Sequence, residues 1–371
     1  PLPFTYTGAG KGTRVNKEGL IEVVENDRPR IDYTDSEDGV FLLEKAATNL
    51  FPYSNKFDTD WNLNNITTTN EQIGVGGSSD AWKITASSGS GEKKLNKNIL
   101  VSGNHAISVY AKKGTRDYVY LRGVINGGSK RTFFNLNKGI IETDEAISSQ
   151  MISMGNGWYR CEFVVNQQAG FEFYIGIAKD DNTPSYTDDG TGNIYVQYAQ
   201  AESGNIASSY IPTQGTIQTR VAETASGSGN SEVFNSQEGV FFLNTKALSN
   251  DGTTRTIGLS DGSNSNRIHF INYAVSNGYS VNYRVSNSTQ VAFTEVGNVL
   301  DYQKIAFKYK SGDFSLWYNG FEIDTDDNTT MMTENTLDRL SFRQEPNSFN
   351  YYGKTKEIAY YDEILTDLEL E

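Results

Sequence analysis

The sequence predicts an all-β protein built from two tandem antiparallel β-sandwiches preceded by an N-terminal arm. Three observations support this prediction. Helical periodicity is nearly absent, the informative stretches alternate between apolar and polar residues with a period of two, and clusters of glycine, asparagine, serine and aspartate separate these stretches. At 371 residues the chain exceeds one ordinary domain, and 12% aromatic residues with 35 glycines fit packed strands joined by many turns.

Residues 1–47 differ from the rest of the chain, because glycines, Pro29 and charged residues separate two short β-like pieces, Thr13–Val15 and Gly39–Leu43. This segment holds too little apolar surface to fold alone. We therefore expect a docking arm that packs on the first sandwich or on a neighbouring subunit.

Residues 48–212 are predicted to form the first sandwich. In Ala106–Lys112, one face carries Ile107, Val109 and Ala111, and the other carries Ser108, Tyr110 and Lys112. Asn193–Ala199 places Ile194, Val196 and Tyr198 on its apolar face in the same way. Such alternation is typical of strands with one face in the core and one in water.

Residues 213–232 have few large apolar side chains and are predicted to be a linker. Residues 233–371 resume the strand and turn pattern and are predicted to form the second sandwich. The end of the chain, Thr366–Glu371, suggests a short helix in which Thr366 is the N-cap and Glu369 completes a capping box.

The composition excludes several functional classes. With 32 Lys and Arg against 46 Asp and Glu, the net charge of −14 disfavours a nucleic-acid partner. One cysteine, Cys161, and two histidines, His105 and His269, leave little material for disulfides, zinc sites or a catalytic triad, and we expect structural roles for all three. No apolar run approaches the ~20 residues of a membrane span, so membrane insertion is not expected.

The order of several strings in the first half resembles tailed-bacteriophage structural proteins of the head-spike, head-fibre or minor-tail type. These strings are Gly12–Glu22, Arg28–Tyr33, Phe41–Glu44, Thr48–Ser54, Ser108–Lys113, Gly157–Arg160, Ile194–Glu202 and Ser209–Thr213. In such proteins the later strings belong to a carbohydrate-binding-module-like jelly roll. The second half resembles concanavalin A-like or laminin-G-like domains through Gly239–Leu243, Lys304–Tyr309, Leu316–Gly320 and Tyr361–Leu370.

The resemblance implies a virion protein on the surface of the phage particle: a head fibre, a capsid decoration or a tail-associated component. It implies glycan-binding-type folds and other virion proteins as partners, but it does not identify a ligand. Host cell-surface polysaccharide and neighbouring subunits are the two partners that we consider for the sandwich loops, and we expect a homo-oligomer, with a trimer as one option. We therefore expect a non-enzymatic protein that mediates host adhesion, particle assembly or both.

Two alternatives remain open. One is a glycoside hydrolase or depolymerase that uses Glu322, Asp324 and Asp326 of the second sandwich, since a retaining mechanism needs carboxylates on one face. Asp326 is one methylene shorter than the glutamate that the resembling hydrolases carry there, which disfavours catalysis. The other alternative is a pair of carbohydrate-binding modules from a secreted bacterial enzyme.

Sugar binding needs aromatic rings for stacking and polar partners for hydroxyl groups. Alternation places Tyr118, Tyr120 and Arg122 on one face of a strand, opposite Val119 and Leu121. We expect this face to bind glycans if the protein does so, with Tyr110 and Tyr174 extending it. Tyrosines that pack in a core or in a subunit interface are the competing interpretation.

Calcium is the cofactor that the acidic turns suggest, because it takes oxygen ligands in flexible loops. The candidate ligands are Asp180, Asp181, Asp188 and Asp189. A second acidic turn, Asp324–Asn328, is a weaker candidate, and solvated turns without a metal explain both sequences as well.

Overall fold

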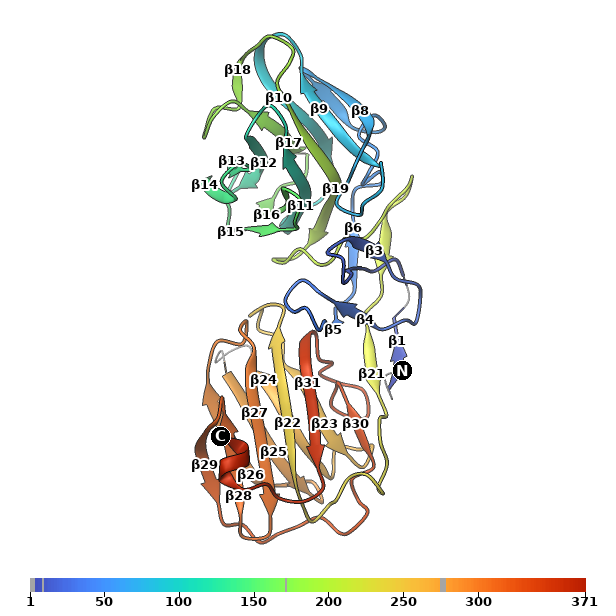
Figure 1. Ribbon diagram of the computed structural model, residues 1–371, viewed down its shortest axis with the longest axis vertical. Coiled ribbons are helices and arrows are strands. Elements are labelled where there is room, and N and C mark those ends of the chain that lie inside the picture. The colour runs from blue at the N-terminus through green and yellow to red at the C-terminus, as the bar shows by residue number, and fades with distance from the viewer. Residues whose placement is uncertain (1–3, 9, 171, 274–277) are drawn as a thin grey trace. The chain divides into compact units, whose positions relative to one another are not determined.

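The computed structural model describes residues 4–8, 10–170, 172–273 and 278–371, which form 31 strands and one short helix (Figure 1). The chain divides into two compact units. Residues 10–25 and 46–221 form one, here called the jelly-roll unit. The remaining described residues form the other, here called the C-terminal unit. The predicted all-β fold with two antiparallel sandwiches is confirmed.

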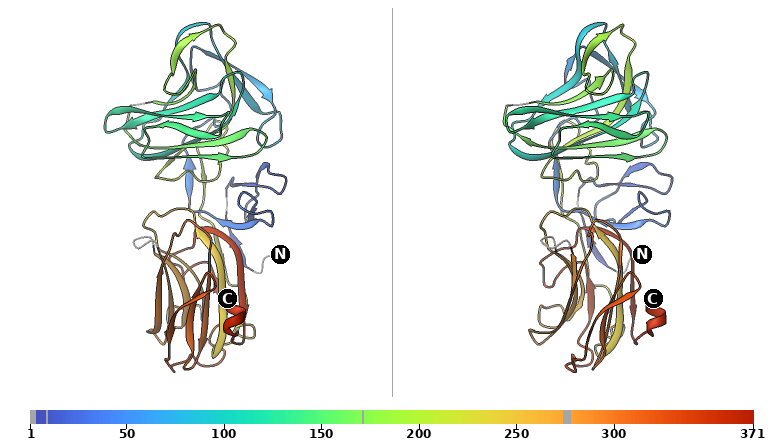
Figure 2. Two further views of the ribbon diagram at one scale, coloured as in Figure 1. Left: turned by 60° about the vertical axis from the view of Figure 1, so that its left-hand side comes forward. Right: turned by 90° about the vertical axis from the view of Figure 1, so that its left-hand side faces the viewer.

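The main body of the jelly-roll unit is a pair of antiparallel sheets whose layers can be followed in Figure 2. The first sheet has the order β14-β13-β12-β17-β10-β18, with β7 also paired to β10. Its strands are β7 (Asn62–Asn64), β10 (Gly89–Asn98), β12 (Tyr118–Ile125), β13 (Gly128–Asn135), β14 (Ile140–Asp144), β17 (Glu172–Ala178) and β18 (Ser185–Asp188). The second sheet has the order β15-β16-β11-β19-β9-β8. Its strands are β8 (Ile66–Gln72), β9 (Ala81–Ala86), β11 (Gly103–Lys113), β15 (Ser148–Ser153), β16 (Trp158–Gln167) and β19 (Asn193–Ser203).

The alternation in β11 decides which side chains enter the core between the two sheets. Ile107, Val109 and Ala111 belong to the large buried cluster of this unit. Tyr110 belongs to a separate cluster on the outward face of the same sheet, as the period of two predicts.

The prediction that Tyr198 lies on the core face of β19 is wrong. The register between β11 and β19 shifts between Ser108 and Tyr110, which inserts a β-bulge at this point. Tyr198 has a φ of 53° and stacks on Tyr210 with a centroid separation of 4.2 Å, in the outward cluster. A bulge moves the following side chain to the other face, and alternation alone does not reveal it.

The C-terminal unit is also a two-sheet sandwich. Its seven-stranded sheet has the order β29-β28-β27-β22-β31-β5-β4 and its five-stranded sheet the order β26-β25-β24-β23-β30. The strands of the first are β4 (Arg30–Asp32), β5 (Val40–Leu43), β22 (Glu238–Ala247), β27 (Gln303–Lys310), β28 (Phe314–Tyr318), β29 (Phe321–Asp326) and β31 (Gly353–Tyr361). Those of the second are β23 (Arg255–Ser260), β24 (Arg267–Tyr273), β25 (Gly278–Val285), β26 (Ser288–Val296) and β30 (Arg339–Ser341).

The N-terminal segment differs from the single docking arm that we expected, because its parts belong to both units. All four residues of β5 are buried, and this strand pairs with β31, so the segment completes the second sandwich. The hairpin of β2 (Thr13–Val15) and β3 (Ile21–Val23) instead packs Ile21 against the outward cluster of the jelly roll that contains Tyr110. Each piece is too short to bury its apolar side chains alone, so each adds to an existing sheet or cluster.

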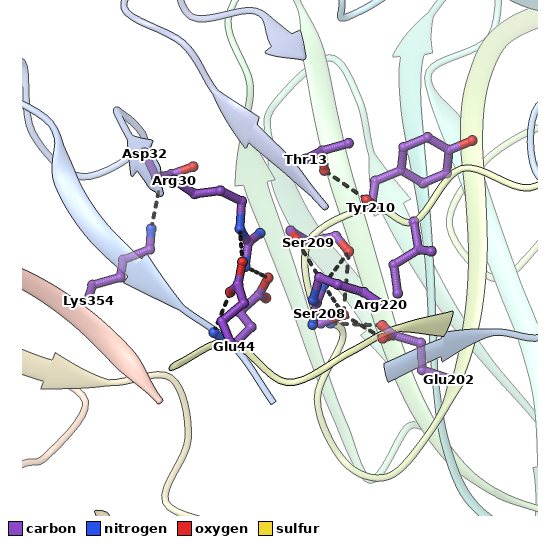
Figure 3. A network of polar contacts seen from close by, with 12 residues as sticks. Thr13, Arg30, Asp32, Glu44, Glu202, Ser208, Ser209, Tyr210, Arg220 and Lys354 are labelled. Carbon is purple, nitrogen blue, oxygen red and sulfur yellow. Dashed lines mark hydrogen bonds and ion pairs between the residues drawn. The ribbon is translucent and has the colours of Figure 1, made fainter. Parts of the chain in front are cut away.

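The expected linker, residues 213–232, contains ordered strands. β20 (Gln218–Arg220) pairs with β6 (Ala47–Asn49), and β21 (Thr224–Ser226) pairs with β1 (Thr5–Thr7). Within the jelly-roll unit, Arg220 is 1% exposed and hydrogen-bonds to Ser208 and Ser209 (Figure 3). Small and polar residues satisfied by such contacts can form fixed structure without a large apolar core of their own.

A second buried arginine lies within the C-terminal unit. Arg30, on β4, is 1% exposed and its guanidinium is 2.7 Å from the Glu44 carboxylate (Figure 3). Glu223 accepts a hydrogen bond of 2.7 Å from Arg30 Nε and one of 2.6 Å from the Tyr6 hydroxyl. Charged groups this deeply buried require such pairing, which ties three distant parts of the sequence together.

The helix α1 (Asp367–Leu370) begins after the N-cap Thr366 and has the predicted capping box with Glu369. In the described part of the chain, no helix is long and apolar enough to cross a membrane.

Candidate functional site

The predicted tyrosine face lies on the outward side of β12. Val119 and Leu121 are in the core of the jelly roll, so the alternation that places Tyr118, Tyr120 and Arg122 on the opposite side is confirmed. The structure does not, however, expose these three side chains equally.

Tyr120 has no exposed surface and is unavailable for stacking on a sugar. Its ring packs on Phe133 with a centroid separation of 5.5 Å and an interplanar angle of 30°. The paired residue on β17 is Gly176, where any Cβ would lie 2.1 Å from the Tyr120 ring. The ring thus packs over a position that must be glycine. It lies beneath the exposed side chains of this face and is not itself exposed.

Tyr118 is held in a polar network at one end of this face. Its hydroxyl donates to Glu142 at 2.9 Å and accepts from Asn135 Nδ2 at 2.9 Å. Burial and the Glu142 carboxylate raise the pKa of the phenol.

Tyr110 does not extend the face, contrary to prediction. It lies on β11 in the other sheet, is 3% exposed, and packs at right angles to Tyr198. The sequence places a residue on one side of its strand but does not say which sheet that strand joins.

Tyr174, in contrast, lies where the prediction put it. Tyr174 pairs with Arg122 on one side and with Asn96 on the other. Asn96 in turn pairs with Asn62, and Arg122 with Arg131. One cross-strand row of outward side chains therefore runs over five strands in the order Arg131, Arg122, Tyr174, Asn96, Asn62.

Beside this row lies a groove with a volume of about 500 Å³, here called the asparagine groove. Its lining residues are Trp61, Asn62, Leu63, Asn64, Lys94, Asn96 and Glu172. The groove lies on β7, β10 and β17, which are neighbours in the first sheet of the jelly roll.

Hydrogen bonds fix the polar side chains of the groove. Asn96 Nδ2 donates to Glu172 Oε1 at 2.6 Å, and Asn64 Nδ2 donates to Asn96 Oδ1. The Trp61 indole donates to the carbonyl of Tyr53 at 2.9 Å, and its ring packs 4.8 Å from Phe51. Because these side chains support one another, they present a preformed pattern of amide and carboxylate groups.

Two cations flank the Tyr174 ring. Lys94 Nζ lies 3.7 Å from the ring centroid and Arg122 Cζ lies 4.2 Å from it. Lys94 is also 2.8 Å from Glu92, which pairs with Arg131 at 3.1 Å. Burial alone would raise the pKa of Glu92, but the contact with Lys94 outweighs it and the pKa is lowered. The face thus carries a fixed aromatic ring within a network of paired charges.

The sequence analysis missed the asparagine groove, although a signal for it exists. Outward positions of β10 alternate as Glu92, Lys94 and Asn96 around the buried Leu95. On β7, Asn62 and Asn64 lie on either side of Leu63, which is itself 42% exposed. The prediction was based on aromatic residues and therefore did not include the polar residues on this half of the face.

The four candidate calcium ligands do not converge. Asp188 is paired with Arg116 at 2.5 Å, and Asp181 accepts bonds from the backbone and hydroxyl of Thr143 at 3.0 and 2.7 Å. Asp189 accepts from the Thr191 hydroxyl at 2.6 Å, whereas Asp180 is exposed. Among the residues that the structure describes, no group of three or more acidic, histidine or cysteine side chains is placed to hold a metal ion.

Burial alone would raise the pKa of Asp188. The hydrogen bonds from Arg116 and from the backbone amides of Gly190 and Gly192 outweigh burial and lower this pKa to about 2. Asp188 is therefore a structural carboxylate that holds its loop through protein partners.

The hydrolase candidates lie on β29, at the edge of the seven-stranded sheet. The β28–β29 register shifts between Leu316 and Trp317, so Glu322 and Asp324 pair with adjacent residues of β28. This irregularity breaks the regular alternation on which a shared face depended. Phe321, at the start of β29, is 73% exposed.

The remaining reactive residue types are buried. Cys161 is fully buried in the jelly-roll core, as expected for a small apolar group. His105 hydrogen-bonds to the Gly103 carbonyl at 2.9 Å through Nδ1 and contacts Ser203 through Nε2. His269 is 1% exposed.

No protein-family model and no curated protein sequence matches the chain. Among solved structures, the CBM40 domain of the Ruminococcus gnavus IT-sialidase, determined with α2,3-sialyllactose, is similar at 16% identity and a TM-score of 0.33, over 39% of this chain and 91% of that one. Domains LG4–5 of the mouse laminin α1 chain match at 9% identity and a TM-score of 0.29, over 90% and 92%. A heptameric SAP-like pentraxin from Limulus polyphemus matches at 13% identity and a TM-score of 0.31, over 37% and 70%. At these scores the similarities to solved structures carry no functional argument.

Proposed function

We propose that the protein is a non-enzymatic adhesion protein that binds a glycan through the asparagine groove and the adjoining Tyr174 ring. The observation that carries the proposal is the cross-strand row in which Tyr174 lies directly between Asn96 and Arg122. An aromatic ring next to amides and a guanidinium matches the two chemistries of a sugar, an apolar ring face and hydroxyl groups.

The polar and aromatic groups of the groove contact different parts of a bound sugar. The exposed Asn62 amide offers donors and an acceptor, and the Glu172 carboxylate accepts, so together they complement hydroxyl groups that donate and accept. Asn96 is 3% exposed and hydrogen-bonds to Asn64 and Glu172, so it holds these groups in position. The Tyr174 ring lies beside these groups with Lys94 and Arg122 over it at 3.7 and 4.2 Å, so a sugar stacks on the ring only when one of these cations moves aside. Because the side chains are already hydrogen-bonded in place, a sugar orders few of them on binding.

The sequence resemblance to tailed-phage structural proteins supports the biological setting that we propose. We place the protein on the surface of the phage particle, as a head fibre, capsid decoration or tail-associated component, where it contacts other virion proteins and host polysaccharide. A groove of this size gives a weak single contact, and many copies on one particle raise the overall affinity without new contacts. Immunogold labelling of virions tests this location, and labelling absent from the particle would contradict it.

Binding measurements on Asn96→Ala and Tyr174→Ala test the groove. With purified host-surface polysaccharide, each variant should bind at least ~10-fold more weakly, which corresponds to ~1.4 kcal/mol. Tyr174→Phe keeps the ring and should retain most of the affinity. Asn137→Ala is the matched control, because Asn137 is an exposed asparagine of a turn outside the groove. Equal binding by all four variants would contradict the proposed site.

A further inference from the structure

The outward face of the five-stranded sheet in the C-terminal unit carries three arginines in one cross-strand row. Arg267 on β24 pairs with Arg284 on β25 and with Ser260 on β23, and Ser260 pairs with Arg339 on β30. The row therefore spans four neighbouring strands. Arg339, at its end, also forms an ion pair of 2.7 Å with its chain neighbour Asp338. The hydrogen bond and charge of Asp338, and the charges of Glu345 and Asp261, raise the pKa of Arg339, so this end of the row carries paired charge.

This arrangement of arginines is energetically unfavourable if its only role is to stabilise the fold. Like charges directly opposite each other on neighbouring strands repel, and Arg267 is only 8% exposed. Arg284 donates to the carbonyl of Asn287 at 2.6 Å, which is a neutral partner, and one of the contacts of Arg267 is a hydrogen bond of 3.1 Å to the carbonyl of Asn264. A site that breaks a local rule of sheet stability is a candidate for function.

An independent observation comes from His269, in the next row of the same face. His269 is 1% exposed, and neither ring nitrogen has a hydrogen-bond partner among the described residues. It pairs with Gly258, where a Cβ would lie 2.2 Å from the imidazole, so the ring lies over the glycine. Its other cross-strand neighbour is Asn282.

The charge state of His269 is set by its surroundings. Burial lowers the pKa of the imidazole well below its usual range, and the nearby charges of Arg267 and Arg284 lower it further. The neutral ring keeps one N–H donor and one acceptor. A buried polar ring without partners is costly unless a bound group supplies them.

We propose that this arginine row, comprising Arg267, Arg284 and Arg339 with His269 beside it, binds a tetrahedral oxyanion carried by a polysaccharide. Guanidinium groups bind sulfate and phosphate oxygens through paired, charge-assisted hydrogen bonds, and the bound charge offsets their mutual repulsion. The shared chemistry is a sulfate ester or a phosphodiester on a sugar polymer. This site is separate from the asparagine groove and does not depend on the groove being functional.

The first test uses the full chain with inorganic sulfate and phosphate, against chloride at equal ionic strength. Sulfate or phosphate should raise the unfolding midpoint of the wild-type C-terminal unit in a saturable way, and Arg284→Gln should weaken the apparent affinity at least ~10-fold. Lys304→Gln, which removes an exposed positive charge from β27, should behave as wild type. Equal responses in both variants would overturn the proposal, since they would reflect ionic strength or a general salt effect.

A second measurement on the unmodified protein covers the case in which Arg284→Gln does not fold. The ring resonances of His269 should shift on addition of sulfate or phosphate, while those of His105 should not. Unchanged His269 resonances up to ~0.1 M anion, well above a millimolar dissociation constant, would overturn the proposal.

Retention of the wild type on immobilised polymers identifies the source of the oxyanion. Retention by sulfated dextran or by a phosphodiester-linked polysaccharide, lost in Arg284→Gln, supports the proposal and says which ester is bound. Stronger retention by duplex DNA than by either polysaccharide would overturn the assignment to a sugar polymer. Tyr174→Ala should leave all of these responses unchanged, so failure of the groove and failure of the arginine row can be distinguished.

Discussion

Replacing Arg30 with glutamine should destabilise the C-terminal unit strongly and leave the jelly-roll unit unaffected. Arg30 is 1% exposed and lies 2.7 Å from Glu44 and in contact with Glu223. Burial alone would lower its pKa, but the two carboxylates outweigh burial and raise it, so the guanidinium stays charged. The variant leaves both carboxylates buried without a cation.

The expected magnitude follows from that geometry. Removing one partner of a buried ion pair costs ~3–5 kcal/mol. In a unit of this size, each kcal/mol lowers the unfolding midpoint by ~2–4 °C, so the shift should be roughly 6–20 °C. The Tyr6 hydroxyl and the Glu44 backbone amide still donate to Glu223, at 2.6 and 2.8 Å, which favours the lower part of that range.

Scanning calorimetry of the full chain provides the assay. We expect two transitions in the wild type, one for each unit, and a shift of one of them in Arg30→Gln. The double variant Arg30→Gln with Glu223→Gln should recover part of the loss, because it removes one uncompensated charge. A loss of stability below ~1 kcal/mol, the typical value for a surface ion pair, would refute the reasoning. Equal shifts of both transition midpoints would also refute it.

Further predictions concern residues to which we give a structural, non-catalytic role. Tyr120→Ala should cost ~3–5 kcal/mol in chemical denaturation, because the ring is fully buried, and a neutral outcome would contradict its placement. The folded-state pKa of Asp188, about 2, lies below its unfolded value, so the Arg116 pair contributes stability above about pH 4 that is lost as the pH falls toward 2; Asp188→Asn should flatten this part of the stability profile. Trypsin should cut slowly after Arg220, which is 1% exposed, and rapid cleavage there would contradict the ordered β20. Glu322→Gln should leave polysaccharide intact and binding unchanged, and loss of a hydrolytic activity in this variant would reverse the non-enzymatic assignment.

Local pattern predicted much of the fold because a strand with one buried face must alternate. The separation of Val109 and Tyr110 onto opposite faces of β11 and the capping box at Thr366 both follow from residues close in sequence. The bulge at Tyr198 escaped prediction because it depends on the register with a partner strand.

Long-range pairing explains the larger differences. Nothing near β5 indicates that its partner is β31, more than three hundred residues later, so the segment resembled a detached arm. For the same reason, only part of the candidate site could be predicted from the sequence. Arg122 and Tyr174 were found from their own strands, whereas their proximity to Asn96 and Asn62 exists only in the assembled sheet.

Hydrogen–deuterium exchange of the full chain, with and without bound host polysaccharide, tests the central proposal most directly. The account predicts slower exchange at β7, β10 and β17, where the asparagine groove and Tyr174 lie, and loss of this protection in Asn96→Ala. Polysaccharide binding without protection of these three strands, or equal protection in Asn96→Ala, would contradict it.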